Sequence, residues 1–129
     1  MVVTDRVREI FADARVLHAD ALEMLAQGKI RNAAEKAWGA TKRATDALVL
    51  ARTGEEPERT PATSVAVRAL EGRDPGVRQV RLIARYYTRQ GALHGDCFYL
   101  GFCDPVDITE RRIRDTIHYI EDAENLAGL

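Results

Sequence analysis

Apolar residues recur at steps of three and four along most of the chain, and that spacing places them on one face only if the chain is helical. The first such stripe consists of Val7, Ile10, Phe11, Ala14, Leu17, Ala21, Met24 and Leu25. No segment alternates apolar and polar residues as a half-buried strand does. The spacing therefore predicts an all-α protein without strands.

Capping residues, glycines and prolines divide this pattern into helices. Thr4 is a good N-cap for the first helix, which ends at Gln27-Gly28, and Asp74-Pro75 is a strong start signal for another. The sequence predicts helices near residues 5–27, 30–52, 64–71, 75–102 and 107–127, with an exposed loop at 53–63. We expect a single domain over residues 1–129. Its predicted fold is an antiparallel up-and-down bundle of four main helices and one short helix.

Composition narrows the class of protein. The chain has 129 residues, 46% hydrophobic and 30% charged, with a net charge of −1, as expected of a soluble globular domain that binds anions only through a local patch. No apolar run approaches the roughly 18 residues that span a bilayer, and the N-terminus lacks the layout of a signal peptide. We therefore expect a cytoplasmic protein without membrane contact, in which Cys97 and Cys103 are buried thiols.

The stretch from residue 78 to residue 102 looks like the central helix of the bundle. At α-helical spacing, one side carries a basic ridge formed by Arg78, Arg81, Arg85 and Arg89. The opposite side carries the residues expected to face the core, which are Val80, Ala84, Tyr87, Gly91 and Phe98. Such a ridge can track a nucleic-acid backbone, and the alternative is a solvated face paired with surface acids.

His94 follows Arg89 by five residues, about 140° around an α-helix, near the apolar side. A half-buried histidine can act as general acid or base, and an arginine can stabilise the charge of a phosphorane-like transition state. Together they suffice for metal-independent RNA cleavage through the ribose 2′-hydroxyl. Because Arg89 and His94 do not share a face, we expect them to act across a dimer cleft. The spacing recurs by chance in an arginine-rich chain, as Arg111 and Arg112 ahead of His118 show.

Other candidate sites have less support. His94, Cys97, Cys103 and Asp104 do not match a closed zinc pattern, so we predict no metal and no cofactor. His18, beside Leu17 in the first helix, is expected to be a half-exposed surface residue.

Two segments carry a resemblance to a known family. Residues 88–99, TRQGALHGDCFY, resemble the signature of the HEPN superfamily, and residues 28–40, GKIRNAAEKAWGA, are similar to the second helix of its archaeal PaREP branch. The resemblance implies a homodimer whose shared cleft binds RNA and, in active members, cuts it without metal. It implies that Arg89 polarises the phosphate, His94 is the acid or base, and Gln90 fills the polar second position. Such proteins often act in defence or as toxins beside a small nucleotidyltransferase antitoxin.

Two other functions remain open at this point. One is a non-catalytic dimeric module that binds a nucleotide or a protein partner through the same cleft. The other is a purely structural dimer.

Overall fold

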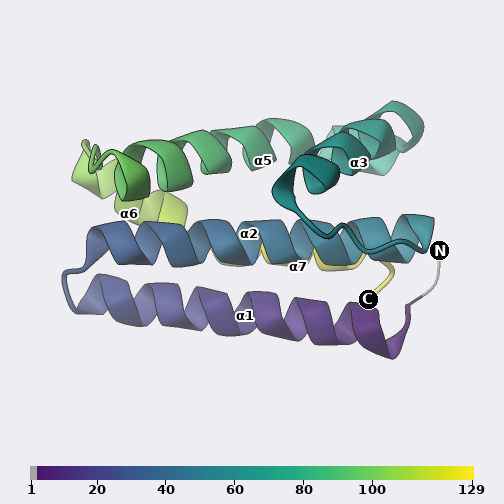
Figure 1. Cartoon of the computed structure of the whole chain (residues 1–129), viewed down its shortest axis with the longest axis horizontal. Helices are drawn as coiled ribbons and strands as arrows, with labels where there is room; N and C mark the ends of the chain where they lie inside the picture. Colours follow the sequence, from purple (N-terminus) through teal and green to yellow (C-terminus); the bar gives the residue numbers. More distant parts are fainter. Residues whose placement is uncertain (1–2) are drawn as a thin grey trace.

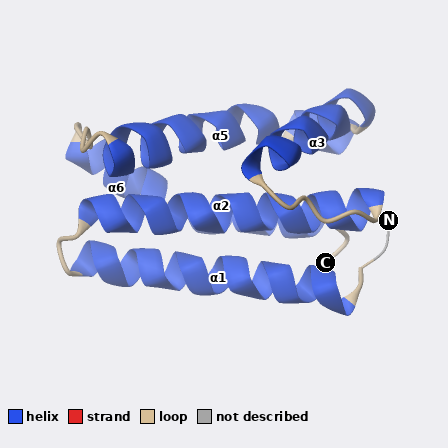
Figure 2. Cartoon of the chain, in the orientation of Figure 1, coloured by secondary structure: helices blue, strands red, loops and turns tan. Residues whose placement is uncertain are grey.

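The computed structural model describes residues 3–129, and every regular element in that range is helical, which confirms the all-α prediction (Figure 2). Met1 and Val2, which belong to the predicted 1–129 domain, lie outside the described residues. The helices are α1 (Asp5–Ala26), α2 (Ile30–Thr53), α3 (Thr60–Arg73), α4 (Pro75–Gln79), α5 (Leu82–Arg89), the π-helix η1 (Gln90–Tyr99), α6 (Val106–Arg114) and α7 (Thr116–Leu126). None of these helices is long and apolar enough to cross a bilayer.

α1 and α2 form a long antiparallel pair, as the sequence predicts (Figure 1). The Thr4 hydroxyl accepts a hydrogen bond from the Val7 N–H at 3.2 Å and caps α1, and Gly28 turns the chain with a φ of 76°. The inner face of α2 is built from fully buried alanines, which let neighbouring helices approach closely: Ala33, Ala34, Ala37, Ala40, Ala44 and Ala47. α2 is thus the central helix of the bundle, in contact with α1, α3, α5, α6, α7 and η1.

The single long helix predicted over residues 75–102 is wrong, because the chain forms three helices there. Arg81 has a φ of 56°, in the left-handed region, and this residue separates α4 from α5. At Gln90 the hydrogen bonds change to the i→i+5 pattern of η1. Gly91 and Gly95 weaken the α-helical preference of that segment, so its packing against α2 decides its winding.

The predicted core face of this segment is only partly right: Val80 and Tyr87 are half-buried and pack against the core. Ala84 and Gly91 are exposed, and the buried residues are Leu82, Tyr86, Arg89, Leu93 and Cys97. Leucine and tyrosine side chains remove far more apolar area from water than alanine and glycine do, so they determine which face turns inward. This register carries Arg89 into the core together with its neighbours.

The last predicted helix divides into α6 and α7 at Asp115, and α7 packs against α1 and α2. Ile113, Thr116 and Ile120 are fully buried, as their spacing predicts. The loop after α2 is held to α1 by Glu56, which accepts hydrogen bonds from the Arg6 guanidinium at 2.8 and 2.9 Å. α6 lies at the end of the bundle opposite the chain termini (Figure 1).

Cys97 and Cys103 form a disulfide, with their Cα atoms 4.3 Å apart, so the prediction of two buried thiols is wrong. The bond joins the last turn of η1 to the segment before α6. The two cysteines are six positions apart in the sequence, and Gly101, with a φ of 74°, turns the chain between them. Because both sulfur atoms belong to the disulfide, neither cysteine can bind zinc as a thiolate.

We expect reduction of this disulfide to lower the free energy of unfolding by about 2 kcal/mol, because an open loop of this length has more conformational freedom in the unfolded chain. Urea denaturation with and without dithiothreitol measures the difference. The Cys97→Ala/Cys103→Ala double variant is the control and should not respond to the reductant. Equal free energies for the oxidised and reduced wild-type chain would contradict the expectation.

Candidate functional site

Arg89 is a buried cation in the middle of the bundle. Arg89 is the last residue of α5, and only 7% of it is exposed to solvent. Its Nε donates a hydrogen bond to Thr41 Oγ1 of α2 at 2.8 Å, and its Nη2 donates to Thr116 Oγ1 of α7. The guanidinium lies 6.0 Å from the centre of the Tyr119 ring. Arg89 therefore ties three helices together through neutral partners.

The charge of Arg89 is not compensated by a carboxylate. Within residues 3–129 it forms no ion pair at 4 Å or less. Burial lowers the pKa of Arg89 to about 10, which still leaves the guanidinium protonated at neutral pH. A buried charge without a counter-ion is costly, so an anion that reaches this position is strongly favoured.

A pocket of about 470 Å³ opens at Arg89, between α5 and the two last helices. Four arginines contribute to its lining, and we call it the arginine pocket: Arg81, Arg85, Arg89 and Arg112. Thr88, Asp115 and His118 also line it, with Val80 and Ala84. Arg85 is neutralised by Asp122 at 2.7 Å, whereas neither Arg81 nor Arg112 has an ion-pair partner within residues 3–129. The pocket therefore holds a surplus of positive charge.

The predicted basic ridge is only partly preserved in this arrangement. Arg81, Arg85 and Arg89 meet at the arginine pocket, but Arg78 does not line it, and its Nη1 donates to the Glu71 carbonyl at 2.6 Å. Arg112 comes from α6 and was not among the predicted ridge residues. The sequence hints at a role for Arg112 only through the spacing of Arg111 and Arg112 ahead of His118. In an arginine-rich chain such a spacing also arises by chance.

His94 occupies a different position from Arg89. Its Nδ1 lies 2.8 and 3.1 Å from the two carboxylate oxygens of Glu35 on α2, and its ring stacks on Phe98 with centroids 6.2 Å apart. Glu35 precedes Thr41, the partner of Arg89, by six residues, or about 9 Å of helix rise. Within one chain the structure therefore does not bring Arg89 and His94 into one pocket. Gln90, the first residue of η1, is half-buried.

His18 lies inside the bundle, so the prediction of a half-exposed surface residue is wrong. It is 9% exposed, and its Nδ1 has no hydrogen-bond partner within residues 3–129. Burial lowers the pKa of His18, and the positive charges of Arg89 and Arg15 lower it further. A neutral His18 beside Arg89 adds no second charge to the core, and it also offers no compensation.

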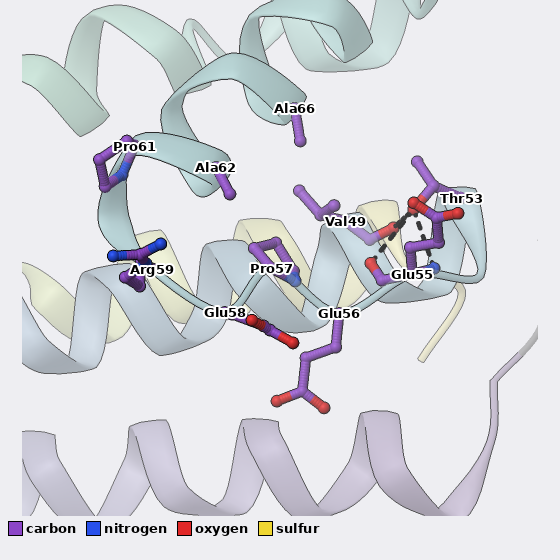
Figure 3. Close-up of a pocket in the computed structure, with 10 residues that line it drawn as sticks. All are labelled: Val49, Thr53, Glu55, Glu56, Pro57, Glu58, Arg59, Pro61, Ala62 and Ala66. Carbon is purple, nitrogen blue, oxygen red and sulfur yellow. Dashed lines mark hydrogen bonds between the residues drawn. The ribbon is translucent and has the colours of Figure 1, made fainter.

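A second depression lies between α2, α3 and the loop that joins them (Figure 3). The loop contributes Glu55, Glu56 and Glu58 to its lining, and α3 contributes Pro61 and Ala62. The Glu56 carboxylate points away from this depression toward α1, where it pairs with Arg6. Its acidic lining makes this depression a poor site for an anion.

The geometry therefore defines the class of this protein as an all-α bundle with an arginine-lined pocket. The chain belongs to the archaeal PaREP1/PaREP8 family, whose model matches residues 9–115. The match covers the four arginines of the pocket and ends just before His118. Neither the curated proteins nor the solved structures give a significant match.

Arg81, which lines the arginine pocket, has a strained backbone, and the free-energy cost of that strain can be measured. Arg81 adopts φ 56° and ψ 41°, a conformation that costs a side-chain-bearing residue about 1–2 kcal/mol. Such strain is typically retained at functional positions. We expect Arg81→Gly to raise the free energy of unfolding by about 0.5–1 kcal/mol, measured by urea denaturation.

Arg78→Gly is the matched control, because Arg78 is an exposed arginine inside α4. There glycine should lower the free energy of unfolding by about 0.5–1 kcal/mol. If both glycine variants lose stability to the same extent, Arg81 is not strained.

Proposed function

We propose that this protein binds RNA, with one backbone phosphate held in the arginine pocket. One observation carries the proposal: Arg89 is a buried cation without a carboxylate partner, at a pocket that three further arginines line. Phosphate suits such a pocket, because the planar fork of arginine matches two phosphate oxygens. The chain as a whole is slightly negative, so the local surplus of positive charge at the pocket is what would attract an anion.

RNA is favoured over other phosphates by the HEPN-like segment itself. Residues 88–99 begin with Thr88 and Arg89, two residues that line the arginine pocket. In RNA-binding HEPN proteins the corresponding arginine contacts the phosphate. The resemblance also makes a toxin–antitoxin or defence role, with a small nucleotidyltransferase as protein partner, the biological setting of this proposal. The alternative ligand for the same pocket is a free nucleotide.

Arg89→Met is the sharpest test of the binding function. We expect it to weaken binding of a fluorescent single-stranded RNA at least tenfold, measured by anisotropy, and to lower the slope of log K against log salt by about 0.7. The free energy of unfolding should stay equal or rise, because methionine removes a buried charge. Thr41 and Thr116 keep hydrogen bonds to the helix carbonyls of Ala37 and Arg112, at 2.8 and 3.4 Å.

Arg73→Met is the control, since Arg73 is exposed on α3 and lies outside the arginine pocket. It should leave RNA affinity unchanged. A large loss of stability in Arg89→Met, with RNA affinity intact, would show that Arg89 serves only the fold. Competition with a free nucleotide then separates the two ligands, since RNA should bind more tightly through its several phosphates.

A second candidate function, metal-independent endoribonuclease activity, is favoured by His118 at the same pocket. The imidazole would take the proton of a ribose 2′-hydroxyl, whose oxygen then bonds to phosphorus while the bond to the 5′-oxygen breaks. The leaving 5′-oxygen takes a proton from water, and the imidazolium returns its own proton to solvent, giving a 2′,3′-cyclic phosphate and a 5′-hydroxyl. Arg89 and Arg112 would stabilise the added charge on the phosphate oxygens.

His94 is the alternative acid or base, and the sequence-based hypothesis places it, with Gln90 and Arg89, in a cleft between two subunits. Its Glu35 partner would hold the imidazole in a fixed orientation. We expect His118→Ala to abolish RNA cleavage in the presence of a chelator and His94→Ala to preserve it, measured by the appearance of cyclic phosphate. Loss of cleavage in His94→Ala alone would support the cleft between subunits instead.

A further inference from the structure

The end of the bundle opposite the chain termini carries α6 (Figure 1). Exposed apolar side chains gather in one short segment there, between residues 99 and 108. We call them the 99–108 surface, which consists of Tyr99, Leu100, Phe102, Val106 and Ile108, exposed by 73%, 70%, 64%, 45% and 38%. The other large exposed apolar residues described, Val16, Val65 and Leu129, are scattered in the sequence. Exposed apolar side chains gathered in this way indicate an interaction site.

The 99–108 surface is held rigidly rather than displayed by a loose loop. The Cys97–Cys103 disulfide closes the segment at its base. Arg31 of α2 donates two hydrogen bonds to the Phe98 carbonyl, at 3.0 and 2.7 Å, and one to the Tyr99 carbonyl at 3.3 Å. The Phe102 N–H donates to the Asp96 carbonyl at 2.7 Å. A braced surface loses little conformational entropy on binding, so its apolar contacts translate efficiently into affinity.

Charges beside these apolar residues indicate what binds there. Asp96, Asp104 and Asp107 are exposed in the same stretch, and their negative charge disfavours RNA and anionic lipid. Asp107, Arg111 and Arg114 are exposed on one face of α6, at steps of four and three residues. The acidic end of this face therefore lies about 10 Å from its basic end.

A face with opposite charges at its two ends is complementary to itself in the antiparallel direction. When two α6 helices pack antiparallel, Asp107 of each meets Arg114 of the other, and a two-fold axis passes between Glu110 and Arg111. The same axis brings the two exposed apolar clusters beside the paired helices. Opposite charges at matched positions select this orientation over a parallel one, in which like charges would meet.

From this complementarity we propose that the 99–108 surface and the outer face of α6 bind a second copy of this chain, antiparallel, with two Asp107–Arg114 ion pairs. The proposal needs no RNA and does not depend on the function of the arginine pocket. It assigns the interface to α6 and the disulfide-braced segment rather than to the cleft that the sequence resemblance implies.

Charge exchange tests the proposed dimer directly, with the full chain studied by sedimentation equilibrium. We expect the wild type to dimerise, and Asp107→Arg and Arg114→Asp each to weaken dimerisation at least tenfold. The chain that carries both substitutions should dimerise again. Most telling, an equal mixture of the two single variants should form a heterodimer. In that heterodimer the arginine introduced into one chain faces the aspartate introduced into the other, and the native Asp107–Arg114 pair forms at the second contact.

The apolar contribution is tested by Phe102→Asp, with Val65→Asp on α3 as the matched control at similar exposure. We expect Phe102→Asp to be monomeric and Val65→Asp to dimerise as the wild type does, with circular dichroism confirming the helical fold of each variant. A monomeric wild type at the highest concentration reached would overturn the proposal. So would a dimer that Asp107→Arg leaves intact, or a mixture of single variants that stays monomeric.

Discussion

The interaction that sets the position of the arginine pocket is the hydrogen bonding of one buried arginine to two threonines. Arg89 links α5 to Thr41 of α2 and to Thr116 of α7, and it also packs against Tyr119. Tyr119 in turn shares a hydrogen bond of 2.7 Å with Thr45 of α2. The core between α2, α5 and α7 is thus a polar network, in which hydroxyl groups satisfy the guanidinium without neutralising it. A carboxylate at either threonine position would neutralise the charge and close the site to an outside anion.

Three costly features meet around this network. Arg89 is a buried charge without a counter-ion, His18 has an unsatisfied ring nitrogen, and Arg81 holds a left-handed backbone conformation. Each lowers the stability of the bundle, and a core of apolar residues would avoid all of them. Such violations gather where function requires them, because a fold selected only for stability has no reason to retain them. Arg89 and Arg81 both line the arginine pocket, and this is the physical reason to expect the function there.

Apolar spacing and capping residues sufficed to predict an all-α chain and the bounds of α1 and α2. They did not predict the division of residues 75–102 into three helices or which face of α5 is buried. Thr4, Gly28 and Gly54 mark real boundaries because their chemistry is local. A pattern that counts arginine as polar places Arg89 outside, whereas Leu82, Tyr86 and Leu93 carry it inward with them. The left-handed conformation of Arg81 has no local sequence signal. The π-helical winding of η1 depends on packing against α2, which a local pattern does not record. For the same reason, spacing alone could not show that His118, and not His94, lines the pocket with Arg89.

α6 connects the arginine pocket to the proposed dimer interface. It presents Arg112 to the pocket, and Asp107, Arg111 and Arg114 to solvent, so a partner on its outer face fixes the position of a pocket residue. α6 is only nine residues long and is joined to α7 at Asp115. A helix this short owes its position to its contacts rather than to its own stability. If the second copy orders α6 in the position that presents Arg112 to the pocket, we expect the proposed dimer to favour the proposed anion binding, and by linkage a bound anion would favour the dimer to the same degree.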